Sequence, residues 1–151
     1  MAGECGISRK GPSARVKLRF EVGDEDFSLA GRASSELKRV LGRLGIGPEL
    51  IRRASVAMYE GEINMVIHAG GGIIEADIDQ GRIKLTLCDT GPGIPDISLA
   101  MTEGWSTASD RYRELGFGAG MGLPNMKRNC DDFEIESEVG KGTRVRMVIN
   151  V

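Results

Sequence analysis

Residues 82–96, "RIKLTLCDTGPGIPD", contain a strand pattern that ends on a carboxylate. Polar and apolar residues alternate up to position 88, as they do in a half-buried β-strand, and Asp89 closes the run. Gly91 and Gly93 then alternate with prolines, and such a segment turns sharply, brings backbone close to a ligand and stays stiff. We interpret Asp89 as an acceptor held at the mouth of a pocket. Taken alone, the stretch also fits an ordinary Asp-Gly-Pro turn.

The overall composition is that of one globular domain with mixed charges. The 151 residues carry a formal net charge of −2, so no basic surplus attracts nucleic acid or an anionic membrane. No apolar run approaches the roughly 20 residues that span a bilayer. Three cysteines without Cys-x-x-Cys spacing indicate reduced thiols and a cytoplasmic setting. We expect residues 1–13 to be a disordered lead and residues 14–151 to form a single domain.

The periodicity of the chain predicts the order β-α-α-β-β-α-loop-α-β-β. The connections between the last strands are as short as hairpins, and parallel strands need longer crossovers. We therefore expect an α+β fold, a two-layer α/β sandwich with a mixed, mostly antiparallel sheet and helices on one face. The predicted strands are 14–22, 73–79, 82–89, 132–138 and 143–151, and the predicted helices lie within 25–45, 48–69, 96–103 and 121–130.

The second helix carries a stripe of polar side chains. Glu60, Asn64 and His68 are spaced i, i+4 and i+8, which places them on one helical face. Apolar neighbours indicate that the helix is largely buried, so the stripe favours a polar ligand over an exposed polar face. Glu62 points nearly the opposite way, and we expect it to be a solvated charge. Gly61 costs about 1 kcal/mol relative to alanine inside a helix, which the close approach of a neighbouring element would explain.

A second glycine-rich loop, "GFGAGMGLP" (116–124), precedes the fourth helix. Glycines that open a helix leave backbone N–H groups free, and together with the helix dipole these groups cradle phosphates. Better-known phosphate motifs are absent, because Lys141 is followed by glycine and no G-x-G-x-x-G follows a strand. The loop therefore predicts an anion cradle of another kind.

Four segments together resemble the boxes of the GHKL (Bergerat-fold) ATPases, and the match runs from about residue 50 to 150. They are "YEGEINMVIHA" (59–69), "DTGPGI" (89–94), "GAGMGL" (118–123) and "GKGT" (140–143). The resemblance implies a Bergerat fold with an ATP lid over 104–117. The short chain and its single histidine, inside the first box, look most like the small stand-alone group of anti-sigma-factor kinases and stressosome switch kinases.

The resemblance assigns roles to individual residues. Glu60 would be the general base, Asn64 would bind the Mg²⁺ that bridges the phosphates, and His68 would lie near those phosphates. Asp89 would accept from the adenine amino group, with Thr143 in support. The other implied ATP contacts are Gly91, Gly93 and Ile94 at the base, Thr107 in the lid, and Gly118, Gly120, Met121, Gly122 and Leu123 at the phosphates. Arg111 and Arg113 are candidates for a lid arginine.

The implied activity is that of an ATP-dependent serine/threonine kinase acting on a STAS-domain antagonist in a partner-switching pathway. A sigma factor or a downstream phosphatase would be a further partner, and the resemblance leaves a homodimer open. One alternative is a non-catalytic ATP-binding anti-sigma module, against which the retained Glu60 argues. A remote alternative is an aspartic protease built on the Asp-Thr-Gly triplet 89–91, but that class is nearly all β and the middle of this chain is predicted to be helical.

Overall fold

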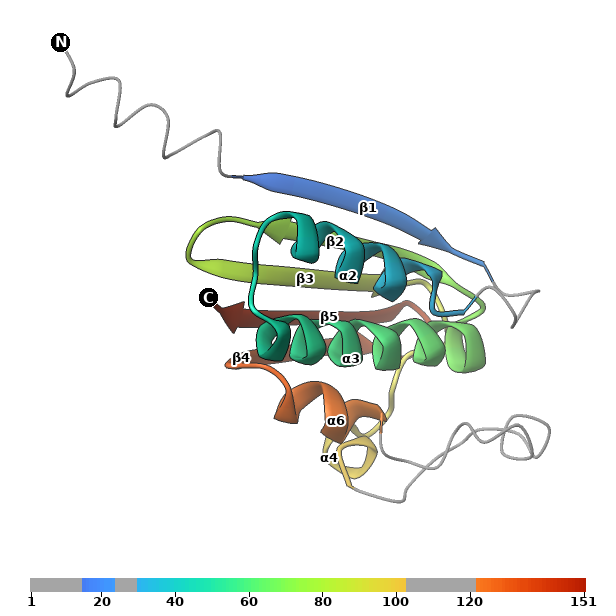
Figure 1. The fold of residues 1–151 in the computed structure, drawn as a ribbon. Coiled ribbons are helices and arrows are strands. Elements are labelled where there is room, and N and C mark those ends of the chain that lie inside the picture. The colour runs from blue at the N-terminus through green and yellow to red at the C-terminus, as the bar shows by residue number, and fades with distance from the viewer. Residues whose placement is uncertain (1–14, 24–29, 103–121) are drawn as a thin grey trace, which may run out of the picture.

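The computed structural model describes residues 15–23, 30–102 and 122–151, which form a five-stranded sheet with helices packed on one face (Figure 1). The strand order is β1-β2-β3-β5-β4. Within the described ranges the predicted elements are confirmed, with the first helix beginning at Arg32. The bounds are β1 Val16–Val22, α2 Arg32–Arg43, α3 Pro48–Asn64, η3 Met65–Ala69, β2 Gly72–Ile78, β3 Arg82–Asp89, α4 Ile97–Ala100, α6 Gly122–Arg128, β4 Asp132–Glu138 and β5 Gly142–Asn150.

The expectation of a mixed sheet is wrong in one respect, because every ladder between the described strands is antiparallel. β3 and β4 do run in the same direction, with α6 between them in the chain. The β4–β5 hairpin, however, inserts β5 between β3 and β4. The two strands that share a direction therefore never pair. No helix in the described part of the chain is long and apolar enough to cross a membrane.

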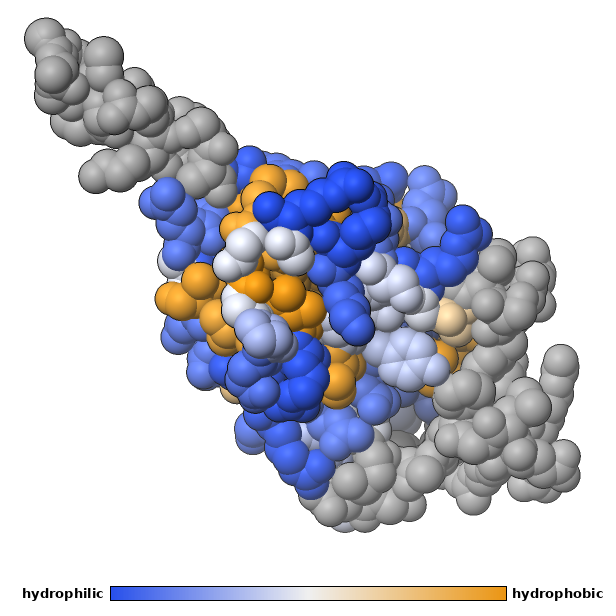
Figure 2. All heavy atoms as spheres, viewed as in Figure 1, coloured by the Kyte–Doolittle hydropathy of each residue, from blue (hydrophilic) through white to orange (hydrophobic). Residues whose placement is uncertain are grey.

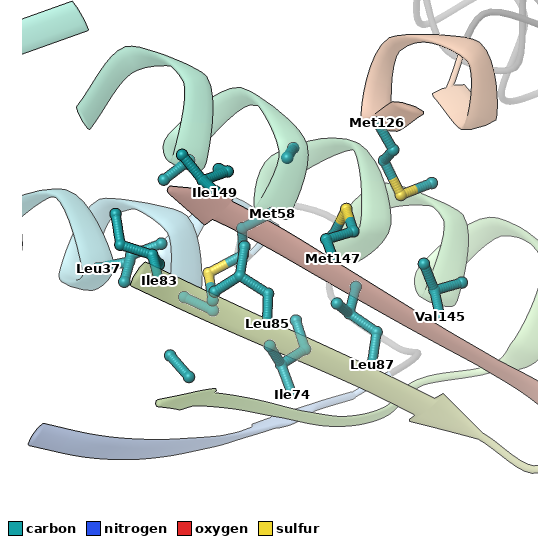
Figure 3. Close-up of a cluster of buried hydrophobic side chains, with 14 of the residues drawn as sticks. Leu37, Met58, Ile74, Ile83, Leu85, Leu87, Met126, Val145, Met147 and Ile149 are labelled. Carbon is teal, nitrogen blue, oxygen red and sulfur yellow. The ribbon is translucent and has the colours of Figure 1, made fainter. Parts of the chain in front are cut away.

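The core lies between the sheet and the helices (Figure 3). Alternate residues of the central strands point to this side, so Leu85 and Met147 pack with Met58 of α3 and are fully buried. The other side of the sheet carries charged residues that form ion pairs, and Arg15, just before β1, pairs with Asp77 of β2 at 2.5 Å. On the helix side the surface is mostly hydrophilic, and hydrophobic residues show through between the polar side chains (Figure 2).

Glu62 is buried rather than solvated, which corrects the expectation from the sequence. Only 2% of the residue is exposed, and its carboxylate accepts three backbone N–H bonds at the start of α2. The donors are Gly31 (3.1 Å), Ala33 (2.9 Å) and Ser34 (3.1 Å). The first N–H groups of a helix need acceptors, and Gly31 at the N-cap has no side chain to provide one. The neighbouring helix α3 therefore supplies the cap.

Gly61 has a packing role that the sequence left open. A Cβ at this position would collide with Leu87 Cδ2 of β3 and would lie 3.6 Å from Met126 Sδ of α6. The missing side chain lets both elements close onto α3. Glycine destabilises the helix at this position, and the tight packing that it permits at the centre of the domain offsets that cost.

Replacing Glu62 with alanine should leave three N–H groups of α2 without their shared acceptor. We expect the free energy of unfolding to fall by about 2–3 kcal/mol, as for a lost cap with buried donors unpaired. Glu49 is an exposed glutamate on the same helix, and Glu49→Ala should change it by no more than about 0.5 kcal/mol. Urea denaturation followed by circular dichroism measures both. Equal losses in the two variants would contradict the capping role.

Candidate functional site

A row of polar side chains lies at one end of the sheet, where the apolar rows of the core stop. Asp89 pairs with Thr143, and Thr143 pairs with Ser137, so the three residues sit side by side on β3, β5 and β4. Each continues the alternation that points its strand's apolar residues toward the helices. The row therefore faces the same side as α3, at the end of the sheet where that helix terminates.

The Asp89 carboxylate is fixed by two backbone bonds to the same oxygen. Oδ1 accepts from Gly91 N at 3.0 Å and from Thr143 N at 3.2 Å. Within the described residues Oδ2 makes no hydrogen bond, and Asp89 is partly exposed. The carboxylate therefore holds one oxygen in place with the protein and keeps the other for a ligand that donates. Its place at the end of β3 is the one predicted from the sequence.

The turn after Asp89 packs against neighbouring backbone through its glycines. A Cβ on Gly91 would lie 2.7 Å from both Cα and Cβ of Ala69. Gly93 has a φ of +81°, and a Cβ there would collide with the carbonyl oxygen of Glu138. Both positions need glycine, although the close approach is to the chain itself. Ile94 completes the turn by donating its N–H to Ser137 Oγ at 2.7 Å.

The helical stripe is only partly as predicted, because α3 ends at Asn64 and continues as a π-helical turn. The wider turn rotates His68 away from the line set by Glu60 and Asn64. The surrounding protein disfavours the imidazolium and lowers the pKa of His68, and the Asp89 carboxylate opposes that shift. π-turns of this kind recur at functional sites.

Two residues of α6 meet the stripe. A Cβ on Gly122 would lie 3.1 Å from Asn64 Oδ1, so the last glycine of the second loop lies against the predicted metal ligand. Asn125 donates Nδ2 to Glu60 Oε2 at 3.1 Å, and its Oδ1 accepts from Arg128 at 2.9 Å. The sequence analysis did not single out Asn125, since nothing local distinguishes it from any polar residue of a short helix.

The structure brings together most of the predicted site residues that it describes. Thr143 donates its backbone N–H to Asp89, and Gly91 and Ile94 form hydrogen bonds within the turn that follows. Gly122 packs against Asn64. Leu123 packs against the hydrophobic core. Ser137 and Asn125 join the site without having been predicted. The residues outside the described ranges are Thr107, Arg111, Arg113, Gly118, Gly120 and Met121.

Replacing Gly91 with alanine should force the turn away from Ala69. We expect a loss of about 1–3 kcal/mol in the free energy of unfolding, typical of an added group in a packed site. Gly81 is the matched control, because a Cβ there meets nothing nearer than 3.6 Å. The amide of Thr143, which donates to Asp89, should also exchange faster in Gly91→Ala when followed by hydrogen exchange. Unchanged protection of that amide would show that the turn does not hold the carboxylate.

Comparison with known proteins agrees with this geometry. The family model of the histidine kinase-like ATPase domain matches residues 23–149. The serine/threonine-protein kinase RsbT of Bacillus subtilis is 36% identical over 115 residues, covering 74% of this chain and 80% of RsbT. The anti-sigma F factor of Thermoanaerobacter sp. (strain X514) is 36% identical over 104 residues, covering 66% of this chain and 69% of that protein.

Two solved structures share the fold. The SiaB–SiaC complex from Pseudomonas aeruginosa contains a chain with a TM-score of 0.62 and 15% identity, covering 98% of this chain and 95% of that one. The RsbU and RsbW domains of a Mycobacterium tuberculosis protein match with a TM-score of 0.60 and 15% identity, covering 89% of this chain and 32% of that one. The resemblance to the GHKL ATPases is confirmed: the chain belongs to the histidine kinase-like ATPase domain family.

Proposed function

We propose that this protein is an ATP-dependent serine/threonine protein kinase that phosphorylates a STAS-domain antagonist in a partner-switching pathway. The observation that carries the proposal is that Glu60 and Asn64 of α3 both contact α6, the latter at Gly122, near the end of the sheet marked by Asp89. These residues would supply a base, a metal ligand, a phosphate-binding backbone and an acceptor for a purine. The names of the relatives, a serine/threonine-protein kinase and an anti-sigma factor, support the same class of activity.

The purine end of the site would be the polar row on the sheet. Asp89 keeps Oδ2 for a donor, and the exocyclic amino group of adenine is such a donor. Thr143 lies beside it, with its N–H already bonded to Oδ1. The glycine turn and Ile94 close this end from the side. Family membership and the helical layer also remove the aspartic protease alternative, because that class of enzyme is nearly all β and belongs to another family.

The phosphate end would lie between Asn64 and the start of α6. The amide oxygen of Asn64 suits Mg²⁺, which prefers oxygen ligands and keeps several waters while it bridges substrate phosphates. No group of three or more histidine, cysteine, aspartate or glutamate residues in the described segments could hold a metal. Mg²⁺ in phosphate-transferring enzymes is usually held by one or two protein oxygens together with the substrate phosphates, and a single oxygen from Asn64 would fit that arrangement. When bound, the ion would neutralise charge developing on the phosphates.

Glu60 would act as the general base toward the substrate hydroxyl. As the hydroxyl oxygen bonds to the γ-phosphorus, the bond from that phosphorus to the bridging oxygen breaks, ADP leaves, and the proton passes to Glu60. Asn125 donates to Oε2 and thereby positions the carboxylate, and Oε1 would accept the proton. A module that only bound ATP would not need a base in this place, so the arrangement favours catalysis over the non-catalytic alternative.

The wider setting of the protein is part of the proposal. Residues 14–151 would act as one kinase domain, since the described parts share a single sheet and core. A sigma factor or a phosphatase would be a further partner, and a homodimer is compatible with the small kinases that the chain resembles. We place the protein in the cytoplasm, where thiols stay reduced. Burial raises the pKa of the Cys130 thiol to about 12, which keeps it unreactive.

Replacing Glu60 with glutamine tests the catalytic step. We expect ATP affinity within about threefold of the wild type and phosphoryl transfer slower by about 10²- to 10⁴-fold. Transfer of labelled γ-phosphate to candidate STAS-domain proteins measures the rate, and calorimetry with Mg-ATP measures binding. Glu49→Gln, on the exposed side of the same helix, is the control and should transfer at the wild-type rate. Equal transfer by Glu60→Gln and the wild type would remove Glu60 from the mechanism.

Replacing Asp89 with asparagine tests the purine contact. Asparagine can keep Oδ1 as the acceptor for Gly91 and Thr143 but presents an NH₂ group where the ligand would donate. We expect ATP affinity to fall by about 10- to 100-fold with the fold retained. Asp79 is a close control, because its Oδ1 also accepts two backbone N–H bonds, at the β2–β3 turn. Asp79→Asn should bind ATP normally, and weakening by both substitutions alike would argue against a direct contact.

A further inference from the structure

Ser137 joins the site through three hydrogen bonds made by a single hydroxyl group. Its Oγ accepts from Ile94 N at 2.7 Å, donates to the carbonyl oxygen of Gly142 at 3.1 Å, and lies 2.8 Å from Thr143 Oγ1. The side chain is partly buried at the end of β4, next to Thr143 in the ladder. None of the predicted nucleotide contacts includes it.

The three bonds leave one consistent assignment of protons. A hydroxyl has one proton to donate and two lone pairs that accept. The Gly142 carbonyl can only accept, so the contact with it consumes the single proton of Ser137. Ser137 must then accept in both remaining contacts, from Ile94 N and from the hydroxyl of Thr143. The hydroxyl of Thr143 therefore donates its proton to Ser137 Oγ and has none left for a ligand.

This assignment determines what Thr143 offers to a ligand. With its proton turned toward Ser137, Thr143 Oγ1 presents only lone pairs to the site. The neighbouring Asp89 also presents only an acceptor, because an ionised carboxylate has no proton to donate. Two acceptors side by side attract an amino group, which donates to them. They disfavour a carbonyl oxygen, because the carboxylate, the Thr143 hydroxyl oxygen and the carbonyl would then face one another without a proton to share.

We propose that Ser137 is a specificity-determining residue, which locks the Thr143 hydroxyl as an acceptor and so selects adenine over guanine nucleotides. The inference rests on the proposed function, in that the site must bind a purine nucleotide at Asp89. Adenine carries an amino group at the position where guanine carries a carbonyl oxygen. A free Thr143 hydroxyl would rotate and donate to that carbonyl, whereas the locked hydroxyl cannot.

The test compares affinities for ATP and GTP, measured by calorimetry with Mg²⁺ on the full chain. The wild type should prefer ATP. Ser137→Ala frees the Thr143 proton and should narrow the ratio of the two affinities by about tenfold, mainly through tighter binding of GTP. Ser137→Thr keeps the hydroxyl and should retain the wild-type ratio. In the double variant Ser137→Ala/Thr143→Val, which has no hydroxyl to release, the gain in GTP binding should disappear.

The outcomes separate a specificity role from a merely structural one. If Ser137 only braces the turn through Ile94, Ser137→Ala weakens ATP and GTP equally, and an unchanged ratio overturns the inference. A wild type that binds neither nucleotide overturns the proposed function itself. Should the alanine variant not fold, as judged by urea denaturation, Ser137→Cys keeps the side-chain size with a weak hydrogen-bonding group and must narrow the ratio in the same way.

Discussion

The two hydrogen bonds that Asp89 accepts on one oxygen are the constraint on which the site depends. They tie the end of β3 to the turn that follows and to the start of β5, so a single carboxylate oxygen holds the three segments that meet at the candidate site. The other oxygen keeps a defined direction because the carboxylate cannot rotate without breaking both bonds. One oxygen of this side chain thus stabilises the fold, and the other is the one that we propose binds the purine.

The helix α3 connects this constraint to the rest of the domain. Glu60 and Asn64 face α6, whereas Glu62 points the other way and caps α2. Gly61, between them, lets β3 and α6 pack closely against the helix. Glu60 and Asn64 are therefore held by a helix that is fixed on two sides, and the roles proposed for them, a base and a metal ligand, would require that rigidity.

The pleat of the sheet explains how a hydrophobic core changes into a polar site without any change of fold. Side chains alternate between the two faces, so the residue two positions beyond each buried aliphatic one must also face the helices. At the end of the sheet those positions carry a carboxylate and two hydroxyls. Hydrogen bonds within this polar row orient the groups, and we propose that the direction of one hydroxyl distinguishes adenine from guanine.

Local patterns determined the strands, the helices, their order and the residues 89–94 that turn at the strand end, since alternation and glycine placement act over a few positions. The same patterns did not reveal that β5 enters between β3 and β4, nor that Glu62 caps a helix about thirty residues earlier in the chain. They likewise missed Ser137 and Asn125, whose partners are 43 and 65 residues away. Sequence alone therefore determined which segments are helix, strand or turn. Only the tertiary structure decided which neighbour satisfies each polar group, because that depends on contacts between segments far apart in the chain.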